Sequence, residues 1–111
     1  MFTYNAKVID VYDGDTITVL ADLGFHTTIK LKIRLFGINT PEVKGVTREA
    51  GLVARDRVNG LVMGKDVVIK THRDKQEKFG RWLGEIYLPD QAKSINSLLV
   101  EEGLAVPFMT E

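Results

Sequence analysis

Hydrophobic and polar residues alternate along the first third of the chain, and this period of two predicts β-strands. The clearest case is the segment of residues 27–36. Its apolar residues would face a core (Ile29, Leu31, Ile33 and Leu35), and its basic residues would take the opposite face (Lys30, Lys32 and Arg34). Residues 2–12 and 16–20 also have strand composition, and the Asp-Gly-Asp turn between them is a strong hairpin signal. Three hairpin-linked strands would form a meander.

Helical spacing replaces this alternation in the middle of the chain. Apolar residues fall on one helical face of residues 47–63: Ala54, Val58, Leu61 and Val62. We expect Thr47 to cap the N-terminus of this helix and Gly64 to end it. Gly51 and Gly60 lie inside the helix and weaken it by roughly 1 kcal/mol each, so they are candidates for positions of close packing.

The last part of the chain returns to strands and ends in a second helix. Residues 65–71 and 81–88 predict strands, and the charged residues 72–80 form the loop between them. Ser94 is expected to cap a short helix over residues 95–102, before a short tail. The order of elements favours an α+β, mainly β fold, a closed five-stranded barrel of the oligonucleotide/oligosaccharide-binding (OB) type with two helices. A half-open sheet with two helices on one side is the alternative.

Length and composition bound the function. The chain has 111 residues, 44% of them hydrophobic, which fits one domain over residues 1–111. Its 15 Lys and Arg balance 15 Asp and Glu, so any attraction to nucleic acid must come from a local patch, and net charge gives no reason to expect a membrane partner. The absence of cysteine excludes disulfides and thiolate chemistry. Residues 1–7 lack an apolar signal core, so we expect a cytoplasmic protein, with the mature form of a secreted protein as the alternative.

Three segments carry groups that could perform chemistry: residues 13–16, residues 34–42 and residues 78–81. In the second segment, Arg34 is a fixed cation, and Asn39 and Thr40 offer oxygens to a hard metal ion. Glu42 is a carboxylate that could act on water as a general base. A cation, oxygen ligands for a metal and a base are the groups that phosphodiester hydrolysis needs.

Each segment also has a plainer interpretation. The carboxylates of the Asp-Gly-Asp turn could bond their own backbone, and this is favoured for the turn taken alone, against a role for Asp15 as a calcium ligand. Asn39 could form an Asx-type turn before Pro41, and Glu42 would then be an ordinary solvated carboxylate. Arg34 and Arg81 are ordinary solvated charges unless they converge on one phosphate, which two guanidinium groups could clamp.

Together, the order and spacing of the motifs resemble the staphylococcal nuclease-like (thermonuclease) family. The resemblance covers residues 7–105 and rests on four elements: Asp13-Gly14-Asp15-Thr16, the segment from Arg34 to Glu42, Phe79-Gly80-Arg81, and Gly103-Leu104-Ala105. It implies a five-stranded barrel and calcium-dependent hydrolysis of DNA and RNA to 3′-phosphate ends.

The resemblance further implies a role for each matching residue. Ca²⁺ would be bound by Asp15, Asn39 and the backbone carbonyl of Thr40. The catalytic residues would be Arg34 and Arg81 on the phosphate and Glu42 on the attacking water. Lys78 and Phe79 would contact the substrate.

Four departures from the family pattern are visible. Asn39 stands where the family has a second aspartate, so one negative charge is lost and calcium should bind more weakly. Phe79 replaces a tyrosine, and Phe108 is the candidate for the stacking surface that a tyrosine provides in the family. The chain also stops before the long C-terminal helix of the family.

Three hypotheses therefore compete. The leading one is a calcium-dependent endonuclease or exonuclease that acts on DNA and RNA, preferring single strands, as a monomer or weak homodimer. The second is a catalytically weak or inactive module that binds single-stranded nucleic acid, which the departures favour. The third is a structural or protein-interaction barrel with solvated charged loops. The joint presence of Asp15, Arg34, Glu42 and Arg81 favours the enzyme.

Overall fold

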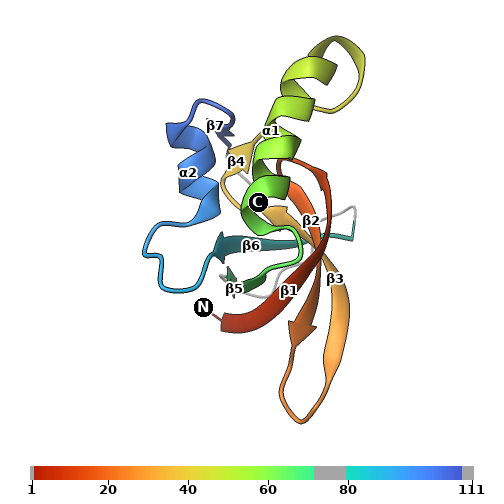
Figure 1. The fold of residues 1–111 in the computed structure, drawn as a ribbon, viewed down its shortest axis with the longest axis vertical. Helices are drawn as coiled ribbons and strands as arrows, with labels where there is room; N and C mark the ends of the chain where they lie inside the picture. Colours follow the sequence, from red (N-terminus) through yellow and green to blue (C-terminus); the bar gives the residue numbers. More distant parts are fainter. Residues whose placement is uncertain (1, 72–79, 109–111) are drawn as a thin grey trace.

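Strands are the predominant regular structure in the computed structural model, which describes residues 2–71 and 80–108 (Figure 1). The strands are β1 (Phe2–Asp13), β2 (Thr16–Asp22), β3 (Thr28–Leu35), β4 (Ile38–Asn39), β5 (Asp66–Thr71), β6 (Trp82–Tyr87) and β7 (Val106–Pro107). The helices are the 3₁₀-helix η1 (Gly45–Thr47), α1 (Arg48–Val62) and α2 (Ile95–Glu101).

Five of the strands close into a barrel in the order β1-β2-β3-β6-β5. Its pairs are antiparallel except β3 and β6, which run parallel from Ile33↔Trp82 to Leu35↔Gly84. β1 pairs with both β2 and β5, and register shifts after Val8 and Val11 mark bulges that bend this long strand. Closure confirms the predicted barrel and excludes the half-open sheet.

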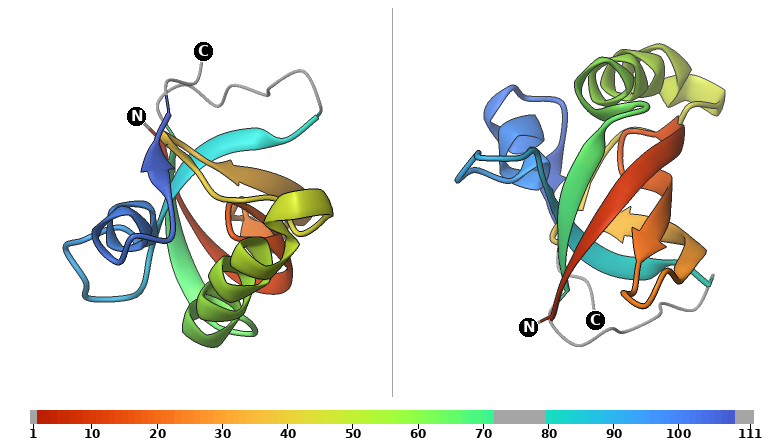
Figure 2. Two further views of the ribbon diagram at one scale, coloured as in Figure 1. Left: turned by 90° about the horizontal axis from the view of Figure 1, so that it is seen from above. Right: turned by 60° about the horizontal axis from the view of Figure 1, so that its bottom comes forward.

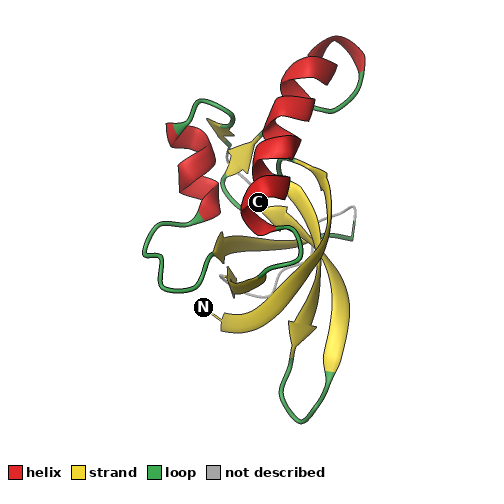
Figure 3. Ribbon diagram, in the orientation of Figure 1, coloured by secondary structure: helices red, strands yellow, loops and turns green. Residues whose placement is uncertain are grey.

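The two helices lie away from the tip of the β2–β3 hairpin (Figures 1 and 3). α1 buries the face that its sequence predicts, at Ala54, Val58 and Val62, and packs mainly against β1. α2 lies beside β6, and Figure 2 shows it separate from α1 in two further views. Ser94 caps α2 as predicted, because its Oγ accepts a hydrogen bond from the N–H of Ser97 at 3.0 Å. Within the described ranges, no helix combines the length and apolar character needed to cross a membrane.

Four details differ from the sequence-based predictions, and three of them concern expected elements. The apolar face of β3 is buried only in its second half, since Ile29 is 44% exposed where the hairpin extends beyond the barrel. Thr47 precedes α1 but makes no side-chain cap; its hydroxyl instead donates to the carbonyl of Glu42 and lies near that of Lys44. Gly60 has nothing within 4 Å of its position for a side chain, so close packing there was a wrong prediction.

The tail is the fourth difference. It contains β7, which pairs with β4 through Ile38↔Pro107 and Asn39↔Val106. The N–H of Phe108 then donates to the carbonyl of Gly37 at 2.8 Å. The strand pair therefore joins the tail to β4, the short strand that carries Asn39.

Candidate active site

The hairpin turn before β2 buries one carboxylate and uses another to hold the backbone. Asp13 Oδ1 accepts a hydrogen bond from the N–H of Asp15 at 3.1 Å, which is the plain turn interaction expected of this motif. Asp15 itself is only 5% exposed. Gly14 is required between them, because a Cβ there would lie 2.8 Å from the Thr40 side chain and 2.9 Å from that of Ala54. The turn thus serves the fold through Asp13 and places Asp15 inside.

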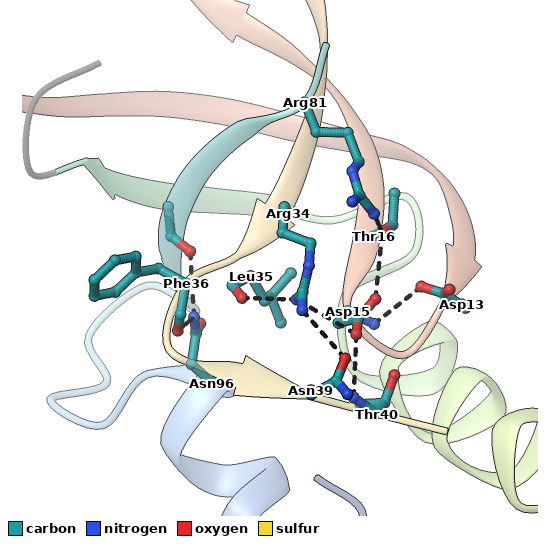
Figure 4. Close-up of polar contacts among 11 residues, drawn as sticks. Asp13, Asp15, Thr16, Arg34, Leu35, Phe36, Asn39, Thr40, Arg81 and Asn96 are labelled. Carbon is teal, nitrogen blue, oxygen red and sulfur yellow. Dashed lines mark hydrogen bonds and ion pairs between the residues drawn. The ribbon is translucent and has the colours of Figure 1, made fainter. Parts of the chain in front are cut away.

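Arg34 directs its guanidinium group at the same carboxylate (Figure 4). Nη1 lies 3.3 Å from Asp15 Oδ2 and donates to the carbonyl of Leu35 at 3.1 Å. Nη2 donates to Asn39 Oδ1 at 3.2 Å. Arg34 leaves β3 on the face opposite the core stripe, as predicted, yet it is only 7% exposed. One buried cation therefore links a carboxylate and an amide oxygen that the sequence separates by 24 positions.

Thr40 completes this cluster from the other side. Its N–H donates to Asp15 Oδ2 at 3.1 Å, and the residue is 5% exposed. Its hydroxyl oxygen is buried and has no hydrogen-bond partner among residues 2–71 and 80–108. Buried hydroxyls usually have a hydrogen-bond partner, so this oxygen keeps the capacity to bind a small polar group or an ion.

Arg81 reaches Asp15 through Thr16. Its Nη1 donates to Thr16 Oγ1 at 2.9 Å, and that hydroxyl donates to Asp15 Oδ1 at 3.3 Å. Strand pairing brings Arg81 near Thr16. Thr16 is opposite Arg34 in the β2–β3 pair, and Arg34 is opposite Leu83, two residues after Arg81, in the β3–β6 pair. The two arginines predicted from the sequence are thus linked to one carboxylate, Arg34 directly and Arg81 through Thr16.

Glu42 lies apart from these contacts. It is exposed, and no hydrogen bond or ion pair engages its carboxylate in the part of the chain that the structure describes. It lines an open hollow that begins at the cluster and is formed by Asn39, Thr40, Pro41, Glu42, Lys44, Gly45, Val46 and Thr47. The carboxylate is therefore available to a molecule in that hollow.

Two other predicted contacts have different outcomes. Lys78 and Phe79 lie outside the described residues. Phe108 places its ring 5.9 Å from the guanidinium carbon of Arg34, which is a cation–π distance. An aromatic surface consequently covers one side of the predicted phosphate-binding arginine.

Asn96 is a supporting residue that sequence reasoning missed. Its side chain is buried, accepts from the N–H of Ile86 at 3.0 Å, and donates to the carbonyls of Phe36 and Gly84 at 2.9 and 3.2 Å. These bonds tie α2 and β6 to the turn that follows Arg34. The only sequence signal was one amide in an apolar helix.

The carboxylates of this region influence each other. Burial raises the pKa of Asp13 to about 6, and the neighbouring carboxylate of Asp15 adds to the effect. Bringing the two acidic groups together is costly for the folded protein, and positive charge near Asp15 offsets this cost.

The cluster contains oxygen atoms of the types that a hard cation accepts. Across residues 2–71 and 80–108, no three His, Cys, Asp or Glu side chains gather in a way that could hold a metal ion. What the cluster offers instead is a carboxylate from Asp15 and an amide oxygen from Asn39, both in contact with Arg34, and the unpaired hydroxyl of Thr40. Calcium accepts all of these ligand types, and a single carboxylate predicts weak binding.

Comparison with known proteins places this geometry in context. The family described as "Staphylococcal nuclease homologue" matches residues 32–111. Micrococcal nuclease of Shigella flexneri is 31% identical over 109 residues, which is 92% of this chain and 57% of that protein. Thermonuclease of Staphylococcus hyicus is 32% identical over 102 residues, which is 89% of this chain and 56% of that protein. Protein ParB of Escherichia coli is 28% identical over 106 residues, which is 89% of this chain and 54% of that protein. The chain thus spans just over half the length of these relatives.

Proposed function

This chain belongs to the family of staphylococcal nuclease homologues, and from that premise we propose that it hydrolyses phosphodiester bonds of DNA and RNA with a bound calcium ion. One observation carries the proposal: Arg34 and the N–H of Thr40 both engage the buried carboxylate of Asp15, and the same guanidinium group holds Asn39 Oδ1. A cation, a carboxylate and neutral oxygens meet at one point beside an open hollow.

Calcium would be held by Asp15, Asn39 and the backbone carbonyl of Thr40, with the unpaired Thr40 hydroxyl close by. Bound there, the ion would neutralise negative charge that develops on a phosphate during hydrolysis. Asn39 in place of a carboxylate removes one charge from the site. We therefore propose a calcium affinity that is lower than two carboxylates would provide.

The arginines would bind and stabilise the phosphate. Arg34 lies next to Asp15 directly and Arg81 through Thr16, so a phosphate beside that carboxylate could be bound by both guanidinium groups. Charge stabilisation by such preorganised groups is usually the largest contribution to catalysis of this kind.

Glu42 would act on the water. Its exposed carboxylate would accept a proton as the water oxygen forms a bond to phosphorus. The bond from phosphorus to the 5′ oxygen would break in line, and that oxygen would take up a proton, leaving a 3′-phosphate. The proposal includes a preference for single strands, whose unpaired bases could stack on Phe108.

A nuclease assay tests the proposal. Purified protein should cut single-stranded DNA and RNA in millimolar calcium and not in chelator. Glu42→Gln should lower kcat by about 100-fold or more, within the range of general-base catalysis. The control is Glu101→Gln, which changes an exposed glutamate on α2 that is paired with Lys93, and it should leave cleavage unchanged. No calcium-dependent cleavage, together with a Glu42→Gln variant identical to the original, would sink the proposal.

Asn39 also favours a second candidate, a module that binds single-stranded nucleic acid without cutting it. Because residue 39 has an amide, Asp15 is the single carboxylate that contacts the guanidinium group of Arg34 among residues 2–71 and 80–108. Oligonucleotide binding that weakens steeply with salt, in the absence of turnover, would favour this candidate.

A further inference from the structure

The backbone at Glu42 lies unusually close to the first turn of α1. A Cβ atom built on Gly51 would overlap the carbonyl oxygen of Glu42, and would lie 2.5 Å from its carbonyl carbon and 2.8 Å from the nitrogen of Val43. Real Cβ atoms do not approach backbone atoms so closely. The segment between β4 and α1 can therefore take this path only because residue 51 is glycine.

The same carbonyl of Glu42 is held by a hydrogen bond. Thr47 Oγ1 donates to it at 2.9 Å and lies 3.3 Å from the carbonyl of Lys44. Thr47 occupies the N-cap position of α1 without using its side chain to cap the helix. Its hydroxyl thus serves the loop that carries Glu42.

The other end of this loop is fixed at the oxygen cluster. The N–H of Thr40 donates to the buried Asp15 carboxylate at 3.1 Å. Glu42 lies two residues further on, and its own carbonyl makes the close contact with α1. Both ends of a short segment are therefore anchored, while the Glu42 side chain is exposed beside the hollow.

We propose that Gly51 and Thr47 are positioning residues that hold Glu42 where its carboxylate can act on water. The inference rests on the proposed function, in which Glu42 is the base. A methyl group at residue 51 would push the Glu42 backbone away by about 1 Å to restore ordinary contact distances. A displacement of this size can lower turnover by about 100-fold when a reacting group must be aligned.

Gly60 supplies a matched control within the same helix. It is exposed and has open space where a side chain would be. Alanine favours helix equally at both positions, so Gly51→Ala and Gly60→Ala differ mainly in the contact with Glu42. We expect Gly60→Ala to keep the original kcat and KM. We expect Gly51→Ala to lower kcat by 10- to 100-fold with KM unchanged within about twofold.

A double-mutant cycle separates positioning from general loss of structure. Added to Glu42→Gln, the Gly51→Ala change should cause no further loss, because the group that it displaces is already inactive. Thr47→Val should lower kcat, and Thr47→Ser, which keeps the hydroxyl, should restore it. Gly51→Ala with the kcat of Gly60→Ala, or losses that multiply in the Glu42→Gln background, would overturn the proposal.

A second measurement does not depend on activity. In ¹⁵N spectra, Gly51→Ala should shift the amide signals of residues 42–44, and Gly60→Ala should leave them in place. If the original protein cuts no substrate, the proposed function fails, while these spectra still test the positioning. Unchanged signals in Gly51→Ala would overturn the inference alone, and Thr47→Val provides the same test should Gly51→Ala not fold.

Discussion

Replacing Arg34 with methionine is expected to destabilise the protein strongly, because it leaves a buried carboxylate without its cation. The side chains of Arg34 and Asp15 are each 8% exposed, and their charged atoms lie 3.3 Å apart. Removing one partner of a buried ion pair costs about 3–5 kcal/mol. Asp15 would keep hydrogen bonds from Thr40 and Thr16, so we expect the lower end, about 3 kcal/mol.

Urea denaturation in chelator measures this loss. With a slope of about 2 kcal/mol/M, the midpoint should fall by about 1.5 M. The control is Arg57→Met. Arg57 binds Glu102 through two bonds of 2.8 Å, which are shorter than the Arg34 contact, but those side chains are 45% and 30% exposed. Exposed pairs contribute little, so no resolvable change is expected there.

The double variant Asp15→Asn/Arg34→Met should regain much of the lost stability, since no uncompensated charge remains. Saturating calcium should also reduce the loss in Arg34→Met if the ion binds next to Asp15. An Arg34→Met variant as stable as Arg57→Met would refute the reasoning, because it would show that neutral donors alone satisfy the buried carboxylate.

Two further predictions concern charge at the site. Asn39→Asp should lower the calcium concentration for half-maximal cleavage, since it restores a charged ligand; an unchanged or higher requirement would place residue 39 away from the ion. Asp13→Asn should become more stable relative to the original protein as pH rises. The folded pKa of Asp13, about 6, exceeds its ordinary value of 3.8, so its protonation stabilises the fold fully below pH 4, and this contribution is lost as pH rises through 6. Because Asp13 is half-buried, we expect a gain of about 1 kcal/mol between pH 4 and 7.5 by urea denaturation in chelator; a difference that is the same at both pH values would contradict it.

Local pattern was sufficient for most of the barrel. Period-two alternation located β3, the Asp-Gly turn located the first hairpin, and helical spacing located the buried face of α1. β7 could not be found in this way, because it has two residues, one of them proline, and forms only by pairing with β4. A strand so short has no pattern of its own.

Residue types at the site were also predictable, while their environment was not. Alternation placed Arg34 away from the core stripe, which suggested a solvated charge. Its burial depends on Asn39, Phe108 and the carboxylate of Asp15 covering that face, and these come from different parts of the chain. Asn96 was missed for the same reason, because its hydrogen-bond partners belong to β6 and to the turn after β3.

The parallel pairing of β3 with β6 affects when the site can assemble. A chain emerging from the ribosome presents Asp15 and Arg34 early, but β6, which closes the barrel beside Arg34, follows only after α1 and β5. β7, the partner of the strand that carries Asn39, comes later still. Long-range pairing of this kind slows folding, since distant segments must meet before their contacts stabilise the structure. The buried charges near Asp15 should therefore stay in water through most of synthesis and be enclosed in one late, cooperative step.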